Sequence, residues 1–287
     1  MPDSPFNPAC CSSSEHTEGW NRSRTIVEVK IHIGTSGWHY KHWLGGVFYP
    51  EGTSGAEMFA HYARHFDTVE INNSFYHLPK AETFDNWRES SPRKFCFAVK
   101  ASRFITHMKK LKDPERSSEK FFLAADRLRE KLGPILFQLP PRWKLNLERL
   151  REFLESLPRE HRYVFEFREE SWLVPEVFAL LREYKVAHCI HDFADMKVPH
   201  ELTARFTYLR FHGPTSAKYY GWYSTRELRA WAQRIESWPV SEIYVYFNND
   251  PEGAAVQNAL ELKGRHIRVG AIHDLWVVQC KCTIQAR

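Results

Sequence analysis

Short β-branched and aromatic runs alternate with stretches of helical periodicity from Lys30 onward. Such runs, bounded by turn residues, are typical of buried strands. They predict eight strands: Ile31–Thr35, Thr68–Asn72, Phe95–Lys100, Ile135–Leu139, Tyr163–Arg168, Ala187–Asp192, Phe206–His212 and Glu242–Asn248. Apolar residues at i, i+3 and i+4 spacing predict the helices between them: Ala56–His65, Thr83–Glu89, Glu115–Lys131, Leu145–Leu157, Pro175–Tyr184, Thr225–Ser237 and Ala254–Leu262.

Strands and helices that alternate without a linker predict an α/β fold, a single closed (β/α)8 barrel of the TIM type over residues 30–265. A doubly wound sheet is the alternative. That fold usually has a glycine-rich dinucleotide turn after its first strand, and Gly34-Thr35-Ser36-Gly37 does not match it. The segment between Asp192 and Phe206 is too short for a full helix. We therefore expect a degenerate sixth crossover.

The two ends of the chain differ from the barrel in composition. Residues 1–29 are rich in Ser, Pro and Asn and are predicted to be a disordered extension, and residues 266–287 an atypical tail. The first stretch lacks the apolar segment of a secretory signal, and no apolar run is long enough to span a membrane. The six cysteines lack zinc-site spacing, which favours a reducing compartment. We expect a cytoplasmic protein without a membrane partner.

Polar residues share one face of several predicted strands. In the second strand Val69 and Ile71 point away from Glu70 and Asn72, because successive side chains alternate in direction. The same alternation places Glu166 and Arg168, and then Arg210 and His212, opposite apolar neighbours. Other strands end in Lys100, in His191-Asp192 and in Asn248-Asn249. These positions predict a polar pocket at the carboxyl-terminal mouth, where such barrels build active sites.

The residue types at this mouth suggest specific roles. Glu70 and Glu166 are the candidate acid/base pair, with His212 as a third catalytic candidate. Lys100, Arg168 and Arg210 would neutralise an anion. An alternative is a structural plug of ion pairs such as Glu70–Lys100 and Glu166–Arg168, without catalysis. The candidate substrate-binding residues are Trp38, Tyr40, Asn72, Tyr76, Lys100, Gln138, Arg168, Trp172, Asp192, Arg210, Tyr219, Asn248 and Asn249.

Aromatic residues in the loops after the strands could stack on a sugar or a base. We expect about half of them to be exposed to the pocket and the others to pack the loops: Trp38, Tyr40, Phe75, Tyr76, Trp172, Tyr219, Tyr220 and Trp222. A metal ring of Glu70, Glu166, Asp192 and His212 is a further alternative. The cationic side chains at the same mouth would repel a metal ion, so no metal and no cofactor is expected.

The sequence resembles the YecE-like proteins, a family with a domain of unknown function, over roughly residues 31–262. The motifs that carry the resemblance are Thr35-Ser36-Gly37-Trp38-x-Tyr40, Phe48-Tyr49-Pro50, Glu70 to Tyr76, Phe97-x-Val99-Lys100, Phe137 to Pro141, Glu166-Phe167-Arg168-x-x-Ser171-Trp172, Arg210 to Gly213, Tyr219-x-Gly221-Trp222-Tyr223 and Tyr246 to Asn249 with Asn258-Ala259. The resemblance implies a TIM-type barrel and leaves the reaction open. Ser74 stands where the family usually has Thr, and the tail after Leu262 looks foreign to it.

The formal charge of +5, from 40 Lys and Arg against 35 Asp and Glu, permits an anionic partner without requiring one. We expect an enzyme, hydrolytic or isomerising, that binds a small anionic, phosphate-bearing or sugar-like molecule at the mouth. One alternative is an endonuclease-like nucleic-acid-binding protein. The other is a non-catalytic barrel that binds a small ligand.

Overall fold

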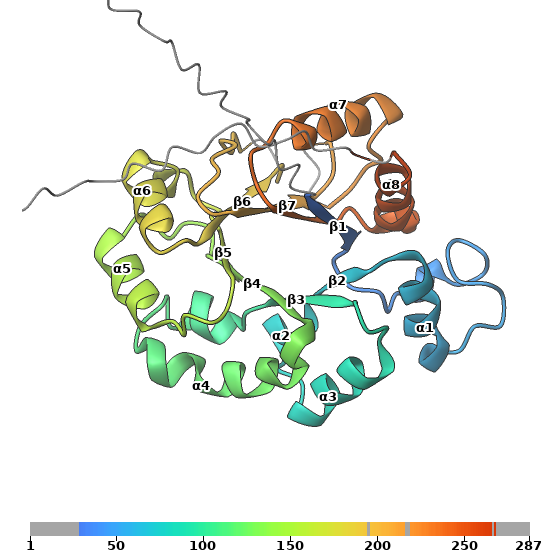
Figure 1. Cartoon of the computed structure of the whole chain (residues 1–287), viewed down its shortest axis with the longest axis horizontal. Helices are drawn as coiled ribbons and strands as arrows, with labels where there is room; N and C mark the ends of the chain where they lie inside the picture. Colours follow the sequence, from blue (N-terminus) through green and yellow to red (C-terminus); the bar gives the residue numbers. More distant parts are fainter. Residues whose placement is uncertain (1–28, 194–195, 216–218, 266, 268–287) are drawn as a thin grey trace, which may run out of the picture.

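Eight parallel strands form a nearly closed barrel in the described part of a computed structural model, which covers residues 29–193, 196–215, 219–265 and 267. Figure 1 shows the strands at the centre and the longer helices around them. The strands follow one another in the order β1-β8-β7-β6-β5-β4-β3-β2. Their bounds are β1 Lys30–Thr35, β2 Thr68–Ile71, β3 Cys96–Lys100, β4 Leu132–Gln138, β5 Tyr163–Glu166, β6 Ala187–His191, β7 Phe206–Phe211 and β8 Glu242–Phe247.

The barrel closes between β1 and β2 through a single parallel bridge that pairs Ser36 with Glu70. A backbone hydrogen bond from Ser36 N to Phe247 O, 2.9 Å long, continues the pairing of β1 with β8 beyond the end of the strand. The fold therefore confirms the predicted TIM-type barrel. It also places Ser36 and Glu70 side by side at the mouth.

Helices cover the outside of the barrel, and each crossover except the sixth contains one in the described residues. The α-helices are α1 Gly55–His65, α2 Asn73–Tyr76, α3 Ala81–Ser90, α4 Pro114–Ala125, α5 Leu147–Ser156, α6 Pro175–Glu183, α7 Thr225–Glu236 and α8 Ala254–Lys263. Shorter helical turns are η1 Lys41–Trp43, η2 Phe104–Met108, η3 Asp126–Lys131, η4 Glu170–Trp172 and η5 Pro251–Gly253. Between β6 and β7 the described residues hold no helix, which confirms the degenerate sixth crossover.

Local sequence explains where helices begin and end. Ser224 caps α7: its backbone N–H donates to a carboxylate oxygen of Glu227 at 2.8 Å, and its hydroxyl accepts from the Glu227 N–H at 3.3 Å. The helix predicted over Glu115–Lys131 is shorter than expected. After α4 the chain continues as η3, in which Arg129 has a φ of +50°. A residue in this left-handed region cannot belong to an α-helix, so the predicted helix extended too far toward Lys131.

Two separate apolar layers follow from the alternation of side chains along the strands. Val69, Phe165 and Leu209 pack outward between strands and helices. Inside the barrel, a smaller cluster includes Tyr208 and Tyr246, whose ring centroids lie 5.1 Å apart. These tyrosines fill the middle of the barrel. The polar layer therefore lies above a filled core, at the carboxyl ends of the strands.

The expectations for the extension at residues 1–29 and the tail at residues 266–287 fall almost wholly on residues outside the described part of the chain. Across the residues that are described, none of the helices combines the length and the apolar character that crossing a membrane requires.

Candidate functional site

A buried guanidinium joins two carboxylates at the mouth. Arg210, near the end of β7, places Nη2 2.7 Å from Glu70 Oε1 and Nη1 2.6 Å from Glu166 Oε2. All three residues are 1% exposed or less. Buried charges are stable only when they are paired, and here one cation compensates carboxylates from β2 and β5. The structure thus brings Glu70, Glu166 and Arg210 together, as the sequence predicted.

Glu70 is held by neutral donors as well. Its Oε1 also accepts the Ser36 hydroxyl at 2.6 Å, and its Oε2 accepts the Tyr208 hydroxyl at 2.6 Å. Sequence reasoning missed both partners. The signal was available, because Ser36 directly follows the first strand and Tyr208 lies two residues before Arg210 on the same strand face. Both oxygens of Glu70 are therefore engaged by the protein itself.

Arg168 forms the second ion pair of Glu166 and also contacts His212. Its Nε donates to Glu166 Oε1, its Nη2 lies 2.9 Å from His212 Nε2, and its guanidinium carbon lies 3.6 Å from the Phe193 ring centroid. Burial would raise the pKa of Glu166, but Arg168 and Arg210 hold it well below its usual value. Glu166 is consequently a carboxylate throughout the physiological range.

His212 is neutral, and its tautomer follows from its neighbours. A guanidinium only donates, so Nε2 accepts from Arg168 and the ring proton sits on Nδ1. Asn248 Nδ2 lies 3.2 Å from that nitrogen, so the Asn248 amide must turn over for its oxygen to accept the proton. Burial, reinforced by Arg168 and Arg210, lowers the pKa of His212 well below its usual value. The contact with Nε2 helps to fix the Arg168 guanidinium, and a catalytic role of His212 stays a prediction.

Lys100, at the end of β3, is 8% exposed. Its ammonium lies 4.1 Å from the centroid of the Phe75 ring and has no hydrogen bond or salt bridge to the described residues. Burial, followed by the charge of Arg210, lowers the pKa of Lys100 to about 7. In this cluster the negative charges of two carboxylates are balanced by the positive charges of two guanidinium groups. Lys100 is therefore its one uncompensated charge among the described residues. The proposed Glu70–Lys100 pair is wrong, since Glu70 pairs with Arg210, whereas the Glu166–Arg168 pair is present.

Asp192 and Asn249 support the loops above the strands. Asp192 accepts the His212 backbone N–H at 2.7 Å and the Tyr223 hydroxyl, while burial raises its pKa to about 6. Asn249 is fully buried and donates to Gly221 O at 2.8 Å and Asn258 Oδ1 at 3.0 Å. Arg210 is also buried, beside its two carboxylates. That Asn249 and Arg210 contact a substrate stays a prediction, and their burial does not favour it.

Gln138, Asn72 and Asn248 remain nearer the surface. Gln138 is 9% exposed, with Oε1 3.5 Å from Arg210 Nη1. Asn72 and Asn248 are half-buried, and the side-chain oxygen of Asn72 has no hydrogen-bond partner among the described residues. This oxygen is itself buried, although the residue as a whole is only half-buried.

The loop aromatics divide into exposed and packed rings, and exposure of half of them to the pocket stays a prediction. Four are exposed, by 39–64%: Tyr76, Tyr219, Tyr220 and Trp222. Trp38 packs on Trp87 at 5.5 Å, and Tyr40 bonds to the carbonyl of Ser36, so both are half-buried. Trp172 is fully buried, stacked on Phe167 with its indole N–H donated to Trp143 O at 2.6 Å. That Trp172 binds substrate stays a prediction, and its burial does not favour that role. It belongs to the core.

The described residues contain no group of three or more His, Cys, Asp and Glu placed to hold a metal ion. The alternative metal ring needs free oxygens on Glu70 and Glu166. Their oxygens are bound by Arg210, Arg168, Ser36 and Tyr208 instead.

Fold and site together define a TIM-type barrel whose carboxyl-terminal mouth holds a buried ionic cluster and Lys100, a lysine without an ion pair among the described residues. The chain belongs to the protein family of unknown function DUF72, whose model matches residues 32–270.

Several curated proteins and solved structures are similar to this chain. UPF0759 protein YunF of Bacillus subtilis is 28% identical over 268 residues, which span 81% of this chain and 93% of YunF. UPF0759 protein YecE of Escherichia coli is 32% identical over 150 residues, 52% of this chain and 50% of YecE. The crystal structure of a DUF72 family protein from Thermotoga maritima has a TM-score of 0.74 and 30% identity, covering 82% of this chain and 98% of that one. A family member from Enterococcus faecalis, 22% identical with a TM-score of 0.67, supports the fold alone.

Proposed function

We propose that the chain is an enzyme that binds a small anionic, phosphate-bearing molecule at the barrel mouth and uses Lys100 for proton transfer. One observation carries the proposal. Lys100 is almost buried, lies against an aromatic ring and has no anionic partner among the described residues. An enclosed cation without a counter-charge is costly, and an anionic ligand would supply that charge.

Arg168 is the second group suited to the anion. It is 9% exposed, and Glu166, His212 and Phe193 hold its guanidinium in place. A fixed guanidinium matches phosphate or carboxylate geometry, and its orientation costs little entropy when ligand arrives. Asn72 and Asn248 add polar contacts, and the exposed rings of Tyr76 and Tyr219 would cover the remainder of the ligand.

The pKa of Lys100, lowered to about 7, suits a group that must both accept and release a proton. The assignment of acid/base chemistry to Glu70 and Glu166 remains an untested prediction. Their oxygens already accept hydrogen bonds from Arg210 and other side chains, so proton transfer by either would first break an ion pair. In this proposal both glutamates hold Arg210, and Lys100 catalyses an isomerisation or a hydrolysis.

Sulfate is the sharpest probe of the anion site, because it stays a dianion between pH 6 and pH 8, whereas a phosphate monoester titrates with a second pKa of about 6. We expect sulfate affinity, measured by calorimetry, to fall about tenfold from pH 6 to pH 8 as Lys100 loses its proton. Lys100→Met should remove that dependence, and the exposed Lys94→Met should keep it. Equal affinity at both pH values in the wild type would refute the anion site.

Exposed rings of Tyr76, Tyr220 and Trp222 favour a second candidate function, an endonuclease-like grip on single-stranded nucleic acid. Base stacking is worth about 1–3 kcal/mol per base. Under this alternative, affinity for a short oligothymidylate falls steeply with salt, because phosphate neutralisation releases counterions. Trp222→Ala would also weaken it about tenfold or more. Absence of binding at low salt removes this candidate and leaves the small-molecule enzyme.

A further inference from the structure

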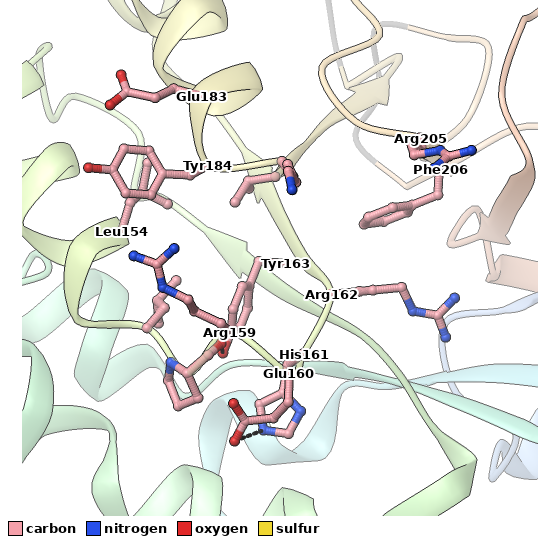
Figure 2. A pocket seen from close by; sticks show the side chains of 14 residues that line it. Leu154, Arg159, Glu160, His161, Arg162, Tyr163, Glu183, Tyr184, Arg205 and Phe206 are labelled. Atoms are coloured by element: carbon pink, nitrogen blue, oxygen red, sulfur yellow. Dashed lines mark hydrogen bonds and ion pairs between the residues drawn. The ribbon is translucent and has the colours of Figure 1, made fainter.

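A cleft lies at the end of the barrel opposite the mouth, at the amino-terminal ends of β5, β6 and β7. It encloses about 580 Å³, a volume typical of small-molecule sites. Its walls come from the loops that precede these strands, and Figure 2 shows the side chains that face it. Leu157, Tyr163 and Phe206 are its buried apolar lining, while Tyr184 is half-buried.

Basic side chains dominate the polar part of this cleft. Arg159, Lys185 and Arg205 are exposed, and among the described residues none of the three side chains has a salt bridge or hydrogen-bond partner. Arg162 is tied to Glu242 and lies with its guanidinium carbon 5.4 Å from the Tyr244 ring centroid. The lining holds four Arg and Lys against two Glu, a net charge of +2 with His161 neutral.

The carboxylates of the lining do not cancel the three free cations. Glu183 is paired with Arg151, which lies outside the cleft, at 3.0 Å. Glu160 lies 4.0 Å from His161, at the other side of the cleft in Figure 2. Neither carboxylate therefore forms a salt bridge with Arg159, Lys185 or Arg205 in the described structure.

The backbone at Lys185 adds an independent observation. Lys185 follows the end of α6 with a φ of +57°, where its N–H donates to Arg182 O at 3.1 Å and the next N–H, of Val186, donates to Leu181 O at 2.9 Å. Glycine usually occupies this left-handed position after a helix, because a side chain there is strained. Here the fold holds a lysine in the strained conformation, and this lysine lines the cleft.

We infer that this cleft is a second binding site, for a compact anion with several charges, such as a small molecule that carries an oligophosphate group. Guanidinium groups bind phosphate oxygens in pairs, and three free cations require more than one negative charge to balance them. The apolar lining would accommodate an uncharged part of the ligand. An extended nucleic-acid strand fits less well, because its phosphates would pass Glu160 or Glu183 on leaving the cleft.

The site is independent of the proposed function. The cleft borders the amino ends of the strands, whereas Lys100 and Arg168 lie at the carboxyl ends. Occupancy here would tie together the loops before β5, β6 and β7, so the ligand acts as a stabiliser or regulator and takes no part in chemistry at the mouth.

Tripolyphosphate, titrated into the full chain by calorimetry, is the test. We expect one tripolyphosphate to bind in this cleft, and Arg159→Gln/Lys185→Gln/Arg205→Gln to lower that affinity at least ~10-fold, since charge-assisted hydrogen bonds are the strong ones. The matched control is Arg93→Gln/Lys94→Gln/Arg226→Gln, which removes equal charge from exposed, unpaired positions outside the cleft. The affinity of this control variant for tripolyphosphate should stay within about twofold of that of the wild type.

The mouth cannot produce this result, because its side chains are intact in both triple variants. Binding that survives in Lys100→Met but is lost in the cleft variant supports the cleft even if the mouth binds no anion. Equal loss in the cleft and control variants would reduce the effect to net charge and overturn the proposal. Tighter binding of a single-stranded oligonucleotide than of tripolyphosphate, with the same dependence on the cleft residues, would replace the compact ligand by a strand.

Discussion

Arg210 Nη1 lies 2.6 Å from Glu166 Oε2 inside the barrel, with neither side chain more than 1% exposed. The second nitrogen of the same guanidinium lies 2.7 Å from Glu70. One cation therefore ties β7 to β2 and to β5, strands that are not neighbours in the sheet. The cluster is both the floor of the candidate site and a cross-brace of the barrel.

Replacement of Arg210 by Met should destabilise the fold strongly. The substitution leaves Glu70 and Glu166 as buried carboxylates without their shared cation. Removal of one partner of a buried ion pair lowers the free energy of unfolding by about 3–5 kcal/mol. Urea unfolding at pH 7 measures the change. The exposed Arg226→Gln is the control and should fall within about 0.5 kcal/mol of the wild type. A loss below about 1 kcal/mol in Arg210→Met would mean that the carboxylates relax or take up protons.

Lys100→Met should have the opposite effect on stability. The pKa of Lys100 is lowered in the folded state, so the unfolded chain binds more protons between pH 7 and about 10.4. Wild-type stability therefore rises with pH across that window through this residue. Removal of the amine should stabilise the protein by ~2 kcal/mol or more at pH 7, with the gain shrinking toward pH 10.

Thermal melts of the wild type, Lys100→Met and Lys94→Met at pH 7, 8.5 and 10 measure the effect. A stabilised variant that also loses sulfate binding is the pattern of a functional residue kept at the expense of stability. If Lys100→Met instead melts lower than the wild type at pH 7, Lys100 has a structural role.

The alternation of apolar and polar residues was sufficient to predict the barrel and the convergence of Glu70, Glu166 and Arg210. Both depend on local pattern and on the rule that parallel strands end at one mouth. Which carboxylate pairs with which cation could not be predicted, because the choice between Lys100 and Arg210 depends on side-chain reach across the barrel. The burial of Trp172 could not be predicted from the sequence either. Its loop position looked like that of Trp222, and only the packing against Phe167 distinguishes them.

The ion pairs of His32 should make the folded protein less stable at alkaline pH. It lies at the amino-terminal end of the barrel, 2.8 Å from Asp67 and 3.2 Å from Glu242. Burial alone would lower its pKa, but hydrogen bonds to these carboxylates raise it to about 9. A raised pKa means that the folded state holds the proton more tightly. The stabilisation is therefore complete below pH 6.5 and is lost as the pH rises through 9.

His32→Gln should flatten this dependence. We expect the difference in unfolding free energy between wild type and variant to be ~1–3 kcal/mol at pH 6 and to shrink toward zero by pH 10, since the partly exposed Asp67 is screened by solvent. His39, which is exposed and has no ion pair in the described structure, provides the control His39→Gln. A constant difference from pH 6 to pH 10 would show that the loss comes from packing on Tyr244 rather than from charge.

Trp172 and Trp222 allow a buried and an exposed tryptophan to be compared near the barrel mouth. Trp172 is fully buried on Phe167, so Trp172→Ala should cost about 3–5 kcal/mol through the cavity it leaves. Trp222 is 49% exposed, so Trp222→Ala should change stability by no more than about 1 kcal/mol. Denaturant unfolding of both variants, followed with sulfate and oligothymidylate titrations, assigns the roles. If Trp222→Ala lowers ligand affinity while it leaves stability unchanged, the exposed ring belongs to the binding surface. If it changes neither, the ring takes no part in binding, and contact with the ligand falls to Tyr219 on the same loop and to Tyr76 after β2.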